Sequence, residues 1–158
     1  MRLVITDTGP VNYLILIGSI DLLPRLFERV VLPSTVQQEL SHPKAPAPVR
    51  QWIANPPSWL EIYQAPPSQP VKGVDEGEAA VISLATTLQP DVLLMDDRRG
   101  TIAAQNKGFR VTGTLGLLDI AAERGLLVFA HAIAALERTS FRFPAGLVET
   151  LLAKHRTT

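Results

Sequence analysis

The sequence predicts an α/β protein, a three-layer α/β/α sandwich in which helices cover both faces of a mostly parallel sheet. Two observations lead to this class. Short apolar runs alternate along the chain with segments of helical pattern, an order typical of parallel sheets. The run Val92–Met95 is apolar at every position, as expected of a strand buried on both faces. The 158 residues fit one domain, 1–158, with C-terminal helices from residues 129–158 packed on it.

Five short segments have the composition of strands. Each is mostly apolar, and turn or helix-start signals follow it. In chain order they are Leu3–Thr6, Arg29–Leu32, Trp59–Tyr63, Val92–Met95 and Phe109–Thr112. Prolines lie close to Trp59–Tyr63, which favours a place at the edge of the sheet, because proline cannot donate to the hydrogen-bond ladder.

The segments between and after these strands predict helices. They are Val11–Ile17, Ile20–Phe27, a segment opened at Ser34, Val49–Asn55, Asp75–Leu88, Arg98–Lys107, Leu115–Arg124, Ala130–Thr139 and Ala145–His155. Pro10 suits the first turn of its helix, since its missing N–H would have no partner there. The spacings Ser34 to Gln37 and Asp75 to Glu78 are those of capping boxes, in which two side chains satisfy the first free N–H groups.

Glycine and proline set the limits of these elements. Gly125 suits the left-handed cap that closes a helix. Pro24 leaves open whether the second segment continues the first as one bent helix or forms a separate one. Pro66–Gly73 reads as a loop.

Composition excludes several classes of protein. Fifteen basic and fifteen acidic residues cancel, so the chain lacks the basic excess of many nucleic-acid binders, and any such contact must be local or supplied by a partner. Cysteine is absent, which excludes disulfides, thiolate metal sites and a cysteine nucleophile. His42, His131 and His155 match no zinc-ligand spacing. With no signal peptide pattern and no long apolar stretch, we expect a cytoplasmic protein that does not enter a membrane.

Five carboxylates are candidates for a functional site: Asp7, Glu39, Glu78, Asp96 and Asp97. Asp7 and the adjacent pair follow two strands directly, where functional groups of a parallel sheet collect. Like charges a few ångströms apart cannot all ionise without a cation, so a converging set would bind a divalent metal or have raised pKa values. Oxygen ligands without His or Cys favour Mg²⁺ or Mn²⁺ over zinc or copper.

Each carboxylate also has a structural explanation. Asp7 could cap the helix that follows it, Glu39 could be a solvated helix residue, and Glu78 could be the reciprocal member of its capping box. One of Asp96 and Asp97 could cap the next helix. The pair is the hardest to explain in this way, because adjacent acids repel each other and turn chemistry does not require both.

Basic residues near the acids could hold a polyanion. Arg98 and Arg99 follow the acidic pair, and a guanidinium group makes bidentate hydrogen bonds to phosphate. Lys72, Lys107 and Arg110 could add to this group. Alternatively, the two arginines neutralise neighbouring acids at the surface.

The order of the acids resembles that of the PIN-domain ribonucleases, the family that includes the VapC-type toxins of bacterial and archaeal toxin–antitoxin pairs. Four segments carry the resemblance, one for each motif of the family: Asp7–Pro10, Val36–Leu40, Gly77–Ala85 and Leu94–Gly100. In the first of these, the aspartate is followed by a small hydroxyl residue, Thr8. The resemblance runs from Met1 to about Gly125, and the tail Phe141–Leu152 resembles a subgroup of PIN-like proteins.

This resemblance implies a PIN-like fold and a ribonuclease that depends on Mg²⁺ or Mn²⁺, as the toxin of a type II toxin–antitoxin pair. The implied partners are RNA, a cognate antitoxin protein and a second copy of the chain. The implied catalytic and metal-binding acids are Asp7, Glu39, Glu78 and Asp97, with Asp96 as a further candidate metal ligand. The residues expected to contact the substrate are Thr8, Arg98 and Arg99.

Two positions depart from the family's pattern. Met95 stands where the family often has Ser or Thr two residues before the fourth acid, so Asp96 and Asp97 are alternatives as the ligand. Ala80 stands where many members keep a second acid after the third motif. The alternative function is therefore a PIN-like module with weak or no catalysis that binds RNA or protein and acts through a partner. A phosphatase or phospho-receiver is less favoured, because receivers carry their acidic pair at the first strand.

Overall fold

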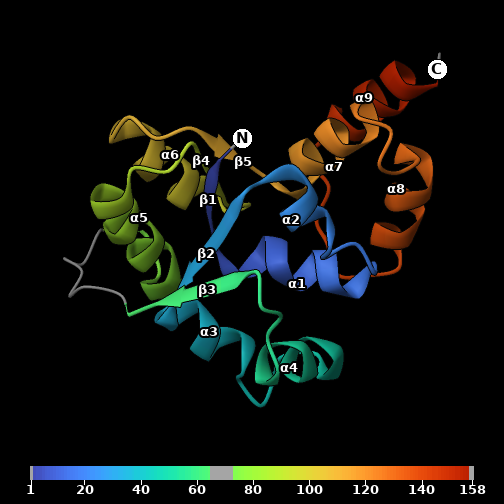
Figure 1. Cartoon of the computed structure of the whole chain (residues 1–158). Helices are drawn as coiled ribbons and strands as arrows, with labels where there is room; N and C mark the ends of the chain where they lie inside the picture. Colours follow the sequence, from blue (N-terminus) through green and yellow to red (C-terminus); the bar gives the residue numbers. More distant parts are fainter. Residues whose placement is uncertain (1, 65–72, 157–158) are drawn as a thin grey trace.

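The structure, a computed structural model, describes residues 2–64 and 73–156 and contains one five-stranded sheet within them. The strands are β1 (Leu3–Thr6), β2 (Arg29–Pro33), β3 (Leu60–Tyr63), β4 (Val92–Leu94) and β5 (Val111–Thr112). Their order is β3-β2-β1-β4-β5, and every pairing is parallel. The predicted class is thus confirmed, and β3 lies at an edge of the sheet, as its prolines indicate (Figure 1).

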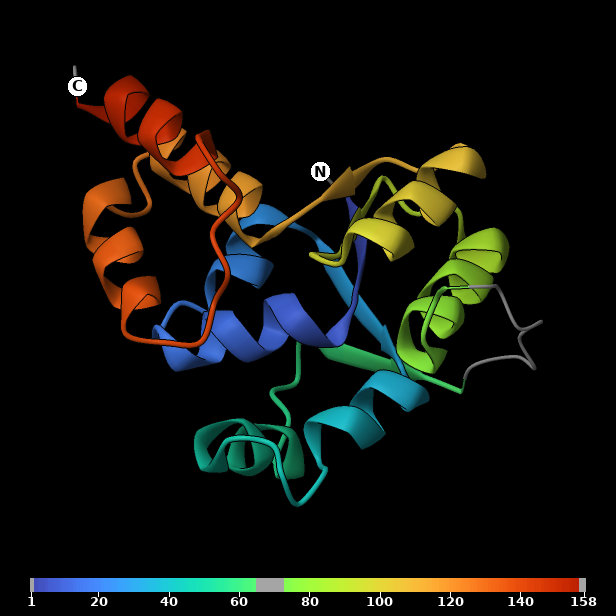
Figure 2. The ribbon, with the colours of Figure 1, turned by 180° about the vertical axis from the view of Figure 1, so that it is seen from behind.

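The helices that cover the sheet are α1 (Thr8–Leu16), α2 (Leu22–Leu26), α3 (Ser34–Leu40), α4 (Ala47–Ala54), α5 (Glu76–Leu88), α6 (Arg98–Asn106), α7 (Thr114–Glu123), α8 (Phe129–Glu137) and α9 (Leu147–His155). In two opposite views, α5 and α6 lie on one side of the sheet, while α1, α2 and α7 lie on the other (Figures 1 and 2). The C-terminal helices α8 and α9 pack against α7 and against each other.

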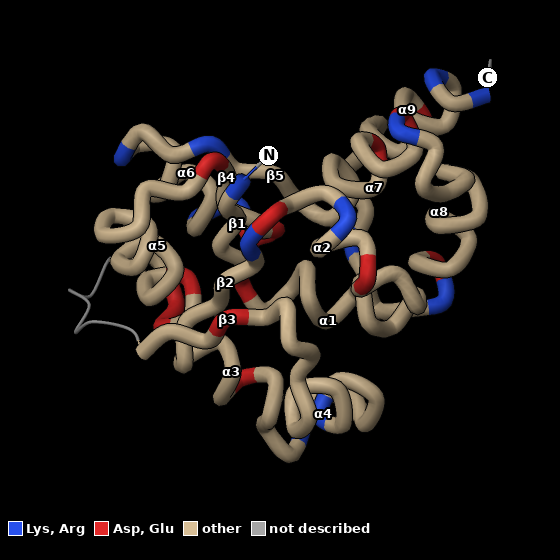
Figure 3. Tube along the Cα trace, in the orientation of Figure 1, with Lys and Arg blue, Asp and Glu red and all other residues tan. Residues whose placement is uncertain are grey.

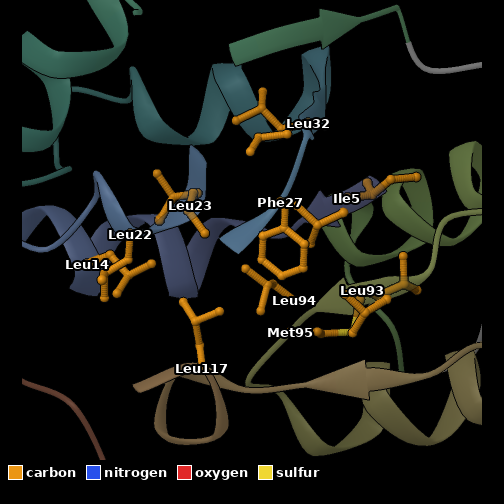
Figure 4. Packing of buried hydrophobic residues seen from close by; sticks show 14 of the residues in the cluster. Ile5, Leu14, Leu22, Leu23, Phe27, Leu32, Leu93, Leu94, Met95 and Leu117 are labelled. Carbon is orange, nitrogen blue, oxygen red and sulfur yellow. The ribbon is translucent and has the colours of Figure 1, made fainter. Parts of the chain in front are cut away.

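The core is continuous from the sheet into both helical layers. Val4, Ile5, Leu93 and Leu94 are completely buried, because the two central strands have helices over both faces. Figure 4 shows side chains of β1, β4, α1, α2 and α7 packed together in this core. The strands β1 and β4 end within this core, and acidic residues follow both ends directly.

Several helix starts differ from the sequence prediction. The first helix begins at Thr8, before Pro10, and Gly18 with a φ of 73° separates it from α2. Two helices therefore form, and Pro24 is tolerated because it lies in the first turn of α2, where an N–H group would be unpaired anyway. The predicted capping box at Ser34 is wrong, since Ser34 is itself the first helical residue and Pro33 occupies the N-cap position.

The capping box predicted at Asp75 and Glu78 is confirmed, with both of its hydrogen bonds present. The predicted loop Pro66–Gly73 lies outside the described residues except for Gly73, and so does Lys72. Among the helices of the described ranges, none is long and apolar enough to cross a membrane.

Candidate functional site

The carboxyl ends of β1 and β4 lie side by side at one edge of the sheet. Parallel pairing aligns Thr6 with Leu94, and the N–H of Asp7 donates to the carbonyl of Leu94 at 2.9 Å. The chain runs from β1 to β2 and β3 in one direction, then returns to β4 and β5 on the other side of β1. This reversal is a topological switch point, the place where open α/β sheets bind ligands.

Asp7 leaves β1 at this point and is buried, with 7% of its surface exposed. It occupies the N-cap position of α1, yet its side chain makes no capping hydrogen bond to the described residues of that helix. Burial is the main cause that raises the pKa of Asp7 to about 8, and the amide of Thr8 opposes this shift. The nearby carboxylates of Asp75, Glu78 and Glu39 raise the pKa further. Helix capping therefore does not explain this side chain.

Glu39 reaches the same region from α3. The hydroxyl of Thr8 donates to Glu39 Oε2 at 3.0 Å, which ties the carboxylate to the first turn of α1. Its other oxygen lies against Gly77, where a Cβ atom would be only 2.0 Å from Glu39 Oε1. Burial raises the pKa of Glu39, and the charges of Asp75 and Glu76 add to the effect. The residue is half-buried between two helix starts and is not the solvated residue of the alternative interpretation.

Glu78 combines a structural and an electrostatic role. The amide of Glu78 donates to Asp75 Oδ1 at 2.8 Å, and the amide of Asp75 donates to Glu78 Oε2 at 3.2 Å. Only 4% of Glu78 is exposed, and burial, followed by the charge of Asp75, raises its pKa to about 7. Its carboxylate also lies against α6, where a Cβ on Gly100 would be 3.0 Å from Glu78 Oε2. Glu78 is therefore a member of the capping box, as predicted, and it also belongs to the group of interacting carboxylates.

Asp75 is the acid that the sequence interpretation left out of the site. It raises the pKa of three carboxylates, those of Asp7, Glu39 and Glu78. Figure 3 shows acidic positions grouped where α5 begins, close to α3. A signal was present in the sequence, since the capping box places Asp75 one helical turn before Glu78.

The adjacent acids Asp96 and Asp97 point to different partners. Asp97 occupies the N-cap position of α6, and its Oδ2 accepts a hydrogen bond from the amide of Gly100 at 3.0 Å. Asp96 accepts two hydrogen bonds of 2.7 Å from Thr114, the first residue of α7. The charge of Asp97 raises the pKa of Glu78, so it acts on the acidic group.

The predicted cationic group is divided by the fold. Arg98 and Arg99 are exposed near the acids, and the side chain of Arg99 passes Gly73, just before α5. Lys107 and Arg110 line a groove with Pro90 and Asp91, and these residues precede β4 and β5. They therefore lie at the amino ends of the strands, at the opposite edge from the acids, and do not belong to the site.

Two grooves open beside the acidic residues. One, of about 360 Å³, is lined by Thr8 and Glu39 and extends past Asn12 to His42. The other, of about 420 Å³, is lined by Asp96 and Arg98 and extends to a largely apolar wall, formed by Met95, Leu115, Phe141, Pro144 and Leu147. Of the acidic residues, Glu39 lines the first groove and Asp96 lines the second.

The donor set suits a hard divalent cation, because it consists of carboxylates without cysteine or histidine. The carboxylates raise one another's pKa values, and a bound cation would relieve that repulsion. Within residues 2–64 and 73–156, however, no three His, Asp or Glu side chains are grouped closely enough to hold an ion. The residues therefore fit a metal by their chemistry, and binding would require their side chains to reorient.

Comparison with known proteins supports the same interpretation. A protein-family model described as a PIN domain matches residues 3–157, nearly the whole chain. No curated protein matches the sequence.

Proposed function

Because the chain belongs to the PIN-domain family, whose members are generally nucleases, we propose that it is a metal-dependent endoribonuclease that hydrolyses RNA phosphodiester bonds. The observation that carries the proposal is the group of interacting carboxylates at the switch point of the sheet. Asp7 and Glu78, with pKa values of about 8 and about 7, are the most strongly affected. Perturbed acids in such a position indicate a functional site.

The residues that would hold Mg²⁺ or Mn²⁺ are Asp7, Glu39, Glu78 and Asp97. When bound, such an ion counters the charge of the phosphate and activates water for hydrolysis. The hydroxyl of Thr8 fixes one oxygen of Glu39 and so orients this carboxylate. Burial and the charge of Asp75 raise the pKa of Glu78 to about 7, and a bound cation would favour the ionised form of this carboxylate. Arg98, beside the second groove, would hold a phosphate group of the RNA.

Cleavage of a panel of structured RNAs by the purified protein tests this proposal. We expect cleavage with Mn²⁺ or Mg²⁺, none with EDTA, and none by Asp7→Asn, which keeps the shape of the side chain and removes its charge. RNAs left intact by the wild-type protein in Mn²⁺ would refute it. So would equal cleavage by the wild type and Asp7→Asn, which would indicate a contaminating nuclease.

The proposal extends to the setting in which the enzyme works. As the toxin of a type II toxin–antitoxin pair, the chain would act in the cytoplasm, bind a cognate antitoxin protein and form a homodimer. Expression of the wild type should arrest growth of a bacterial host, and expression of Asp7→Asn should not. Light scattering of the purified protein measures the oligomeric state, and a monomer at micromolar concentration would contradict the dimer.

A binding module without turnover is the second candidate function. It is favoured by the lack of a ready-made metal group among the described residues and by Ala80, which is 2% exposed and offers no carboxylate. Such a protein would bind RNA or a partner protein with equal affinity in EDTA and in Mn²⁺. Tight Mn²⁺ binding together with RNA cleavage would exclude it.

A further inference from the structure

A groove beside Glu39 carries polar side chains that have no role in the proposed catalysis. The groove has a volume of about 360 Å³ and lies between α1, α3 and α4, and Thr8 and Glu39 connect it to the acidic group. The rest of its lining is four apolar and two polar residues: Leu40, Ala45, Pro46 and Val49, and Asn12 and His42. Small-ligand sites have volumes of roughly 300–1,000 Å³ and combine apolar walls with a few polar groups in this way.

Asn12 brings an amide group into this groove. It follows Thr8 by one helical turn on α1, so the two side chains lie on the same face of the helix, about 6 Å apart along its axis. Asn12 is partly buried, and its side chain makes no hydrogen bond to the described residues. Its oxygen can therefore accept from a ligand and its NH₂ group can donate to one. Asparagine uses the same two groups when it pairs with the edge of a nucleobase.

His42 adds a donor whose position is fixed by the turn between α3 and α4. The backbone N–H of Lys44 donates to His42 Nδ1 at 3.0 Å, so the proton of the neutral ring is on Nε2. The N–H of Ala45 donates to the carbonyl of His42 at 2.9 Å and closes the same turn. The groove thus offers an amide and an N–H donor beside apolar walls, which is what a flat ring with a polar edge requires.

Two basic residues adjoin the groove on the side of α4. Lys44 precedes Ala45 in the turn, and Arg50 Nε donates to the carbonyl of Ala45 at 3.0 Å. Neither side chain forms an ion pair with a carboxylate of the described residues. Figure 3 shows basic positions at α4 and in the turn before it, and acidic positions where α5 begins. The charges match a ligand that carries one phosphate toward the acids and their metal ion and another toward α4.

The second groove, on the side of Arg98, lacks this pattern. Its carboxylate, Asp96, accepts two hydrogen bonds of 2.7 Å from Thr114, so both of its oxygens are already engaged. Its wall is largely apolar. Of the two grooves, the one at Asn12 is therefore better suited to recognise a base.

We propose that the groove between α1, α3 and α4 binds one nucleotide of the RNA beside the cleavage site, and that Asn12 determines which base is accepted there. The base packs against Pro46 and Val49, and its polar edge contacts the amide of Asn12 and Nε2 of His42. Lys44 contacts the phosphate. The link to cleavage rests on the proposed function, whereas binding of a nucleotide in the groove requires neither a metal ion nor turnover.

Nucleoside 5′-monophosphates test the groove without catalysis. In EDTA, we expect at least one of the four common ribonucleotides, at millimolar concentration, to shift the NMR signals of the Asn12 side-chain amide and of the backbone amides of Ala45 and Val49. Asn12→Ala should bind this nucleotide about fivefold more weakly, as expected for the loss of a hydrogen bond. The matched control is Asn106→Ala, at the end of α6, which should bind it as the wild type does. Groove signals that no nucleotide shifts, or that inorganic phosphate shifts equally, would overturn the proposal.

A second pair of variants tests the phosphate contact. Lys44→Gln and Lys107→Gln each remove one positive charge, but Lys107 lies at the opposite edge of the sheet. We expect Lys44→Gln to weaken nucleotide binding by about two- to fivefold and Lys107→Gln to leave it unchanged. Equal affinities of the two variants would refute the contact of Lys44 with the phosphate.

Sequencing of the fragments of a randomised RNA, cleaved in Mn²⁺, connects the groove to the reaction. The wild type should favour particular bases at one position beside the cut, and Asn12→Ala should lose this preference while it keeps its affinity for Mn²⁺. Asn12→Asp, which replaces the donating NH₂ group with an acceptor, should redirect the preference to bases that donate. An unchanged preference in Asn12→Ala would contradict the role of Asn12. If the wild type left the RNA intact, the proposed function would fail, and the nucleotide titration would still decide whether the groove binds a base.

Discussion

Replacing Asp7 with asparagine should change how the stability of the protein depends on pH. In the folded chain, burial raises the pKa of Asp7 to about 8, whereas in the unfolded chain the group titrates near its ordinary value of 3.8. Between these values, the folded chain holds a proton that the unfolded chain has lost. The contribution of Asp7 to stability is therefore fully present below about pH 4 and is lost as the pH rises to about 8.

The size of this effect follows from the same two pKa values. From about pH 5 to about pH 8, a range of about three pH units, the stabilisation by Asp7 falls by about 1.36 kcal/mol for each unit. The free energy of unfolding of the wild type should fall by about 4 kcal/mol through this one group. A domain of this kind is stable by roughly 5–15 kcal/mol, so such a change is readily measured.

Urea denaturation in EDTA, over this pH range, tests the prediction for the wild type and Asp7→Asn. The free energy of unfolding of Asp7→Asn minus that of the wild type should rise by about 4 kcal/mol between about pH 5 and about pH 8. Glu78 also titrates in this range, but it does so in both proteins, so its contribution cancels in the difference. Asp91→Asn is the control, because the amide of Leu3 lowers the pKa of Asp91, so its effect should be constant over the range. A difference between Asp7→Asn and the wild type that varies by less than about 1 kcal/mol would refute the reasoning.

Three further variants have distinct expected outcomes. Gly77→Ala should weaken Mn²⁺ binding in calorimetric titration by about tenfold or more, because its Cβ would lie 2.0 Å from Glu39 Oε1 and would displace this carboxylate. Leu94→Ala should cost about 2–5 kcal/mol in urea denaturation, since Leu94 is completely buried in β4. Asp119→Asn should cost about 1–3 kcal/mol in the same assay, because the Asp119 side chain is only 19% exposed and contacts both Lys154 and His155.

The glycine variant has a matched control in Gly9→Ala. Position 9 also lies in the first turn of a helix, but an added Cβ there would make only an ordinary contact of 3.5 Å. Alanine at position 9 should leave stability unchanged or raise it by up to about 1 kcal/mol, since glycine is unfavourable in a helix. If Gly9→Ala weakened Mn²⁺ binding as much as Gly77→Ala, the close approach of Glu39 to Gly77 would not be the cause of the lost affinity.

Local signals in the sequence were sufficient for the fold. Apolar runs of strand length, alternating with helical segments, predicted a parallel sheet with an edge strand at Trp59–Tyr63, and pairing bears this out. The capping box at Asp75 was predicted correctly because both of its partners lie within one helical turn. The one at Ser34 was wrong, because the same spacing arises inside a helix that begins one residue earlier than a cap requires.

The sequence by itself determined the α/β class and the acids that follow β1 and β4, since both depend on residue type and short-range order. Only the tertiary structure decided which residues share the site. It brought Asp75 into the acidic group, set Lys107 and Arg110 at the far edge of the sheet, and paired Asp96 with Thr114 across 18 positions. These relations depend on which strands are neighbours and where backbones approach, and neither is encoded in the spacing along the chain.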